Sequence, residues 1–164
     1  MALDFPVFVK LEDNTCVLVG GGEYSADAAE LLLSFGAKIT VIAPDLCPRL
    51  RALDEAGQIR HIPRKFFRGD TANCYLCVAA SGDKNTNIAV AVECKARHVL
   101  VNVEEPAEYG TMTLPKVVRA DGLVGGFASE DVDALENLCA AMQKKIPDVW
   151  EQSETRAKRL HSDD

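Results

Sequence analysis

Residues 17–25, Val-Leu-Val-Gly-Gly-Gly-Glu-Tyr-Ser, place a glycine turn between a short apolar run and a segment whose apolar residues recur at helical spacing. In this G-x-G-x-x-S pattern, Gly20 permits a tight turn, Gly22 lets the backbone approach a diphosphate, and the small Ser25 allows close packing of the helix. Free N–H groups at the start of the helix would bind the phosphates. The order of strand, turn and helix therefore predicts a dinucleotide site.

The alternation of strand and helix continues along the chain. Strands are predicted at residues 15–19, 38–42, 59–62, 75–80 and 99–103, and helices at residues 25–35, 50–56 and 85–96. Short, almost wholly apolar strands separated by helices are typical of a parallel sheet that is covered on both faces. We therefore predict an α/β fold, a Rossmann-type doubly wound parallel sheet over residues 1–113, to which residues 5–9 could add an edge strand.

The pattern changes after residue 113. Two short apolar runs, residues 116–120 and 123–127, flank Asp121-Gly122, which is a strong hairpin signal. A helix is predicted to follow at residues 132–145.

Pro147 is expected to end that helix, because a proline disfavours helical geometry in the residue before it. A lone hairpin and helix are marginally stable, so we predict that residues 114–147 form a dimerisation segment that docks on a second copy of the chain. Residues 148–164 are predicted to be a polar tail.

Composition narrows the classes of partner. The formal net charge of −7 and the acidic pI argue against nucleic acid, because binding phosphates requires a concentrated basic surface. No apolar run is long enough to predict a membrane span, and the first four residues lack the basic start of a secretory signal. We therefore expect a cytoplasmic protein that binds neither nucleic acid nor membrane.

The six cysteines are expected to be reduced structural residues rather than metal ligands. Cys74 and Cys77 form a C-x-x-C motif inside an apolar run that is predicted to be a strand. Three residues apart on a strand, their side chains point to opposite faces and cannot share a metal or a disulfide. No second closely spaced pair of cysteine or histidine accompanies them, so no metal site is predicted.

Asp45, just past the predicted second strand, bears on the choice of cofactor. An acid there can accept hydrogen bonds from ribose hydroxyls and repel a 2′-phosphate, which favours NAD over NADP. Arg49 and Arg51 lie nearby and favour the opposite choice. An alternative without a cofactor is that the glycines only turn the chain and that Asp45 caps the following helix.

Several segments together resemble the precorrin-2 dehydrogenase family, the N-terminal module of siroheme synthases. The similar segments are Phe-Pro-Val-Phe at 5–8, the glycine turn, Leu-Leu-Leu at 31–33, Gly-Ala-Lys-Ile-Thr-Val-Ile-Ala-Pro at 36–44, Ala-Ala-Ser-Gly-Asp at 79–83, Asn87, Val-Asn-Val at 101–103 and Pro115. They cover about residues 5–150 in order. The resemblance implies a homodimeric oxidoreductase that converts precorrin-2 to sirohydrochlorin with NAD, and some members of the family also insert ferrous iron.

The resemblance also implies which residues contact the nucleotide. They are Glu23 and Tyr24 after the glycines, Pro44 and Asp45 after the second strand, and Ser81 in the loop after the fourth.

An aspartate important in the family falls on Glu105 when the chain is counted without a gap from Asn102 to Pro115. As a catalytic residue, Glu105 could assist proton loss from the macrocycle while hydride leaves for the nicotinamide. The alternative is that Glu104 and Glu105 belong to a solvated acidic loop.

The implied substrate is a tetrapyrrole with many carboxylates, which needs basic groups around it. We predict that Lys116 and Arg119 bind it and that Ser129 lies at the rim of the site. The basic residues 64, 65 and 68 form a second group, although such residues more often form a solvated face.

Three departures from the family pattern leave other functions open. Asp27-Ala28 replaces an Arg-Lys pair of the family, and acidic residues at 130–133 replace its Gly-Gly-x-Ser-Pro segment. Most of the family's helical C-terminal domain is absent from this sequence, and the resemblance implies that residues 148–164 are its remnant. The alternatives are a non-catalytic NAD-binding or regulatory partner of tetrapyrrole enzymes, and a sirohydrochlorin ferrochelatase.

Overall fold

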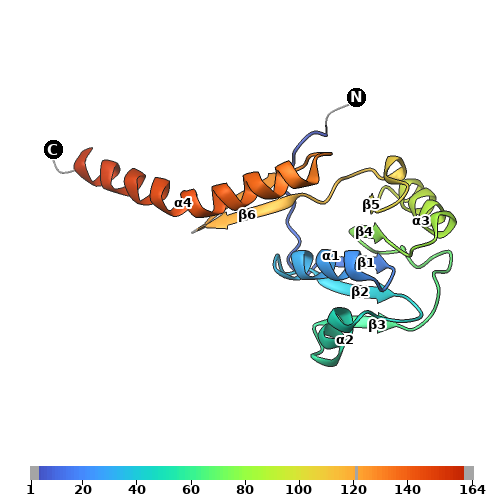
Figure 1. The fold of residues 1–164 in the computed structure, drawn as a ribbon. Helices are drawn as coiled ribbons and strands as arrows, with labels where there is room; N and C mark the ends of the chain where they lie inside the picture. Colours follow the sequence, from blue (N-terminus) through green and yellow to red (C-terminus); the bar gives the residue numbers. More distant parts are fainter. Residues whose placement is uncertain (1–3, 121, 161–164) are drawn as a thin grey trace. The chain divides into compact units, whose positions relative to one another are not determined.

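The computed structural model describes residues 4–120 and 122–160. The chain divides after Thr113 into two compact units, which are described separately below. Figure 1 shows the strands and helices of both units.

The first unit is a five-stranded parallel sheet with helices between its strands. Its strands are β1 (Thr15–Val19), β2 (Lys38–Ile42), β3 (Ile59–Ile62), β4 (Leu76–Ala79) and β5 (Leu100–Val103), in the spatial order β3-β2-β1-β4-β5. Its helices are α1 (Glu23–Leu33), α2 (Pro48–Glu55) and α3 (Lys84–Ala96), followed by the short η1 (Ala107–Tyr109). The predicted doubly wound α/β fold is confirmed, and its strand order reverses between β1 and β4.

The two faces of the sheet are covered by different helices. Below α3, the sheet contributes Val17, Val19, Val101 and Val103 to a buried apolar cluster. Side chains alternate along a strand, so Asn102 faces the other side, where the hydroxyl of Tyr24 on α1 reaches it. Burial on both faces explains why the central strands are almost wholly apolar.

The second unit consists of an antiparallel hairpin and one long helix. Strands β6 (Lys116–Ala120) and β7 (Leu123–Phe127) pair with Ala120 opposite Leu123, and α4 (Val132–Leu160) packs against β6. Gly122 in the turn has a φ of +84°, a conformation that favours glycine. The predicted hairpin is confirmed.

Two predicted elements are wrong. Residues 5–9 form no strand in the described part of the chain: Pro6 has no backbone N–H to donate, and Phe5 and Phe8 remain 85% and 77% exposed instead of packing on the sheet. The helix predicted to end at Pro147 continues as α4 to Leu160, with Pro147 inside it, where its ring removes one backbone donor. Residues 148–160 of the predicted polar tail are thus helical, and 161–164 lie outside the described residues.

None of the helices that the structure describes has both the length and the apolar character needed to cross a membrane.

Candidate functional site

The glycine turn after β1 packs closely between the segments that follow β2 and β4. Gly20 has a φ of +131°, and a Cβ on it would lie 1.9 Å from the carbonyl oxygen of Ala80. A Cβ on Gly21 would lie 1.9 Å from the carbonyl oxygen of Asp45. Only glycine fits at both positions, so the turn brings the ends of three strands to one edge of the sheet.

Gly22 and Ser25 give this turn the features of a phosphate site. Gly22 is exposed, and a Cβ on it would meet no heavy atom within 4 Å, so its backbone is open to a ligand. Gly22 also precedes α1 without any side chain that caps the helix. The hydroxyl of Ser25 is fully buried and has no hydrogen-bond partner among the described residues. Free helix N–H groups and an unsatisfied buried hydroxyl fit a diphosphate.

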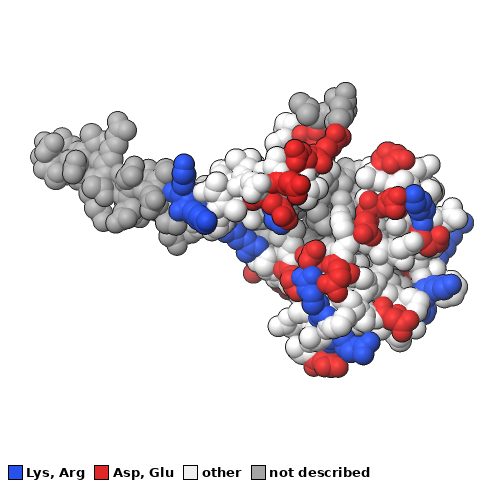
Figure 2. Space-filling model, viewed as in Figure 1, with Lys and Arg blue, Asp and Glu red and all other residues white. Residues whose placement is uncertain are grey.

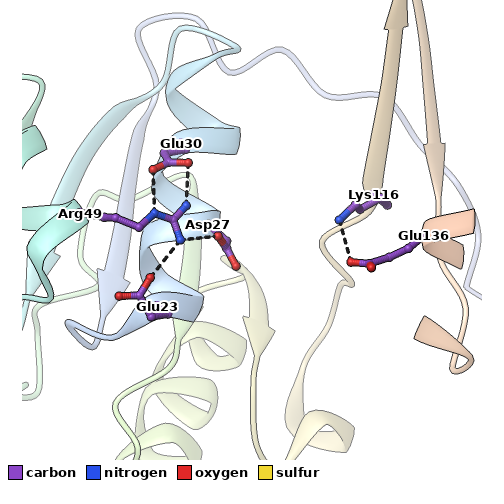
Figure 3. A network of polar contacts seen from close by, with 6 residues as sticks. All are labelled: Glu23, Asp27, Glu30, Arg49, Lys116 and Glu136. Carbon is purple, nitrogen blue, oxygen red and sulfur yellow. Dashed lines mark hydrogen bonds and ion pairs between the residues drawn. The ribbon is translucent and has the colours of Figure 1, made fainter. Parts of the chain in front are cut away.

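An arginine and three carboxylates lie beside this turn (Figure 3). Arg49 of α2 contacts Glu23 at 3.0 Å, Asp27 at 2.8 Å and Glu30 at 2.7 Å, all on α1. Hydrogen bonds to these carboxylates raise the pKa of the Arg49 guanidinium further above its ordinary value. Arg51 donates to the carbonyl oxygen of Leu46 at 3.3 Å.

In the loop after β2, the negative charge of Asp45 is not offset by the nearby arginines. Both arginines that the sequence places near Asp45 already have partners, whereas Asp45 and Pro44 are exposed. This arrangement suits ribose hydroxyls better than a 2′-phosphate.

Asn87 organises the loop after β4, and it is a residue that the sequence alone does not assign to the site. Its side chain is 1% exposed, and its Oδ1 accepts hydrogen bonds from the backbone N–H (3.0 Å) and the hydroxyl (2.8 Å) of Ser81. Its Nδ2 donates to the backbone carbonyl of Glu105 at 2.8 Å. An amide on the buried face of an otherwise apolar helix is the signal that points to it. Asn87 thus connects the predicted cofactor loop to the end of β5.

Tyr24 joins α1 to the end of the same strand. Its hydroxyl donates to Oδ1 of Asn102 at 2.7 Å, and burial raises the pKa of the half-buried phenol. The predicted nucleotide residue Tyr24 therefore lies beside the strand end that carries the two glutamates.

The two glutamates after β5 differ in their surroundings. Glu105, the predicted acid/base, forms an ion pair with Lys84 at 2.6 Å. Both side chains are exposed, and the pKa of Glu104 is raised above its ordinary value, first by desolvation and second by the charge of Glu105. Glu104 also continues the parallel ladder, because its N–H donates to the carbonyl of Ala79 at 3.0 Å.

The residues predicted to bind the substrate belong to the second unit, where each has a local partner. Lys116 pairs with Glu136 at 3.3 Å, also drawn in Figure 3. The backbone of Arg119 exchanges two hydrogen bonds with the side chain of Gln143. The hydroxyl of Ser129 accepts from the N–H of Asp131 at 3.1 Å, in the turn before α4.

Of the second predicted basic group, Arg64 is held by Asp70 through two hydrogen bonds of 2.7 and 2.8 Å. This pairing lowers the pKa of Asp70.

Figure 2 shows acidic and basic side chains interspersed on the face in view.

The cysteines are free thiols. Within the described ranges, no three histidine, cysteine, aspartate or glutamate side chains come together as a metal site.

Comparisons with known proteins agree with this geometry. The family described as "Putative NAD(P)-binding" matches residues 7–116. A siroheme synthase from Chromobacterium violaceum is 40% identical over 125 residues, which are 76% of this chain and 27% of that protein. A probable multifunctional siroheme biosynthesis protein from Ruminiclostridium josui is 30% identical over 129 residues, 79% of this chain and 25% of that protein. The chain spans about a quarter of the length of these curated relatives.

A solved structure titled "SirC, precorrin-2 dehydrogenase" shares the fold with a TM-score of 0.67. The match covers 95% of this chain and 76% of that one, at 22% identity.

Proposed function

Because this chain belongs to the NAD(P)-binding family that matches residues 7–116, we propose that it is an oxidoreductase that converts precorrin-2 to sirohydrochlorin with NAD. The names of its relatives, siroheme synthases and a siroheme biosynthesis protein, support this reaction. The observation that carries the proposal is the open backbone at Gly22 beside the unsatisfied hydroxyl of Ser25, at the sheet edge where β5 presents two carboxylates.

The residues around the glycine turn would hold the cofactor. Gly20 and Gly22 shape the diphosphate site, and Glu23 and Tyr24 begin the helix that faces it. When bound, the nicotinamide supplies a hydride acceptor.

Two loops complete the proposed cofactor site. Pro44 and Asp45 would contact the adenosine ribose, and Ser81 would approach from the loop after β4. We propose NAD rather than NADP, because Asp45 repels a 2′-phosphate and Arg49 is already neutralised by three carboxylates.

The carboxylates after β5 supply the second requirement of a dehydrogenation, which is a group that accepts a proton. Glu104 and Glu105 stand at the carboxyl end of a parallel strand, the edge at which open α/β sheets bind their ligands. A carboxylate there can assist proton loss from a bound tetrapyrrole.

The second unit would contribute the substrate side. Lys116 and Arg119 offer cations to the substrate carboxylates, and Ser129 offers a hydroxyl. We propose that this unit acts in a homodimer, because a two-stranded sheet with one helix is marginally stable by itself. The cytoplasmic location expected from the sequence stays a prediction.

Calorimetric titration of the purified chain tests the proposal, first with NAD and then with sirohydrochlorin, the product. We expect both to bind and NADP to bind at least about tenfold more weakly than NAD, a difference of about 1.4 kcal/mol. Binding of NAD without sirohydrochlorin would favour a regulatory partner. Binding of sirohydrochlorin without NAD would favour a ferrochelatase.

A further inference from the structure

The amide of Asn87 on α3 is held at both ends by backbone groups of other segments. Its Oδ1 accepts hydrogen bonds from the backbone N–H (3.0 Å) and the hydroxyl (2.8 Å) of Ser81, and its Nδ2 donates to the carbonyl of Glu105 at 2.8 Å. A backbone N–H can only donate and a backbone carbonyl can only accept, so one orientation of the amide satisfies both neighbours. The side chain is 1% exposed, so these bonds are not shared with solvent.

These bonds decide what Ser81 can offer to a ligand. Its hydroxyl has a single proton, and the acceptors that face this proton belong to the chain itself: Asn87 Oδ1 at 2.8 Å and the carbonyl of Asp83 at 3.2 Å. The hydroxyl oxygen receives one bond, from the N–H of Asp83 at 3.3 Å, and keeps a second lone pair. Because Ser81 is only half-buried, this lone pair can accept a hydrogen bond from a ligand.

The start of α3 is already occupied by a carboxylate of the chain. Oδ2 of Asp83 accepts hydrogen bonds from the N–H (3.0 Å) and the hydroxyl (2.6 Å) of Thr86. The start of α1, in contrast, has no side-chain cap. A phosphate is therefore favoured at α1 and repelled by the loop after β4. That loop suits a neutral group that donates, such as a sugar hydroxyl.

The order of the strands indicates which sugar of a dinucleotide reaches this loop. β1 lies between β2 and β4 in the sheet (Figure 1), and a Cβ on Gly20 would touch the carbonyl of Ala80, the residue before Ser81. A diphosphate at the turn after β1 separates the two halves of the cofactor. If the adenosine half lies over the loop after β2, the nicotinamide half extends over the loop after β4. The ribose of that half carries hydroxyls that can donate.

We propose that Asn87 is a positioning residue that holds Ser81 as a hydrogen-bond acceptor for a hydroxyl of the nicotinamide ribose. This inference rests on the proposed function, because it requires a nicotinamide dinucleotide at the glycine turn. Without Asn87, the hydroxyl of Ser81 is free to rotate and the backbone N–H of Ser81 loses its partner. The loop would then no longer present the lone pair in one direction, and binding would carry the cost of ordering it. Asn87 is buried and acts only through Ser81.

Calorimetric titration of the whole chain with NAD and two of its fragments tests this inference. ADP-ribose contains the second ribose, whereas ADP ends at the diphosphate. We expect Asn87→Ala and Ser81→Ala each to weaken binding of NAD and of ADP-ribose by about five- to tenfold, as loss of one hydrogen bond does. The affinity for ADP should change by less than about twofold. A residue with only a structural role would weaken the binding of all three ligands.

The double variant tests whether Asn87 acts through Ser81. If it does, N87A adds little to the loss of ADP-ribose binding that S81A already causes, whereas independent contacts would add their free energies. Thr86→Val is the matched control, because it removes a hydrogen bond to Asp83 in the same turn of α3 and leaves Ser81 unaltered. It should bind ADP-ribose as the unaltered chain does.

The remaining outcomes separate the inference from the proposed function. Unchanged ADP-ribose binding in either variant, equal losses for ADP and ADP-ribose, or losses that add in the double variant overturn the inference while the proposed function stands. If N87A does not fold, S81A decides: a loss confined to NAD and ADP-ribose supports the inference, and unchanged affinities overturn it. An unaltered chain that binds neither NAD nor ADP-ribose overturns both.

Discussion

The first and second units of the chain differ in how completely they bury their apolar residues. Every residue of β4 is buried. In the second unit, Val132 and Leu138 on α4 are 62% and 49% exposed, and among the hydrophobic residues described up to position 146 only Val118 and Cys139 are buried. The first unit is thus a self-contained nucleotide-binding fold, whereas the second leaves apolar surface exposed, at which the proposed homodimer would form.

The largest expected effect is a loss of stability when Gly20, a tightly packed residue of the first unit, is replaced. Gly20→Ala should destabilise the chain by about 3 kcal/mol or more, because the added Cβ would overlap the Ala80 carbonyl and the φ of +131° disfavours alanine. Urea unfolding measures the change. Gly22→Ala is the matched control, since its Cβ meets open space: it should unfold like the unaltered chain and bind NAD more weakly. Equal stability of the two variants would refute the close contact between Gly20 and the Ala80 carbonyl.

A smaller effect is expected from a charge on the exposed apolar surface of the second unit. Leu138→Glu should raise the dimer dissociation constant by about 10- to 100-fold, as loss of a buried apolar contact does in an interface. Sedimentation equilibrium measures it, with the exposed neighbour Asn137→Glu as control. A monomeric unaltered chain, or identical dissociation constants, would show that α4 does not form the dimer contact.

A decrease of a few degrees in Tm is expected when the ion pair between Arg64 and Asp70 in the first unit is broken. Asp70→Asn should lower Tm by about 3 °C at neutral pH, because Arg64 loses a bidentate carboxylate partner. The pKa of Asp70 is lowered in the folded chain, so its stabilisation is fully present above the unfolded pKa near 3.8 and is lost as pH falls through the lower pKa of the folded chain.

The Tm difference between D70N and the unaltered chain should accordingly vanish at low pH. Asp13→Asn, which breaks the exposed pair with Lys38, should leave Tm almost unchanged and serves as control. A difference that does not shrink as the pH is lowered further below 3.8 would contradict the assignment to the Asp70 carboxylate.

The smallest expected effect concerns cofactor choice in the first unit. The triple variant Glu23→Gln, Asp27→Asn and Glu30→Gln should release Arg49 and strengthen NADP binding by about fivefold, a modest gain because the site is exposed. Calorimetry with NADP and NAD measures it. If NADP affinity does not change, the three carboxylates do not control the choice.

The sequence predicts the first unit well, because its signals are local. β-Branched runs and the glycine turn place β1, β2 and β3 at their observed bounds. The N-terminal segment and the end of α4 are predicted wrongly. Whether Phe5 packs and whether a helix tolerates Pro147 depend on neighbours that no local pattern contains.

In the candidate site, too, some residues follow from local sequence patterns and others only from the fold. Gly20 and Gly22 follow from spacing alone, and both lie in the turn between β1 and α1; their contact with a cofactor stays a prediction. The Tyr24–Asn102 hydrogen bond and the anchoring role of Asn87 join residues far apart in sequence, so only the fold reveals them.

Anaerobic incubation of the purified chain with precorrin-2 and NAD tests the central claim most directly. Absorbance follows NADH and sirohydrochlorin together. The proposed function predicts that both form in equal amounts and that neither forms when NAD is omitted. A chain that is saturated with NAD yet forms neither product would contradict it.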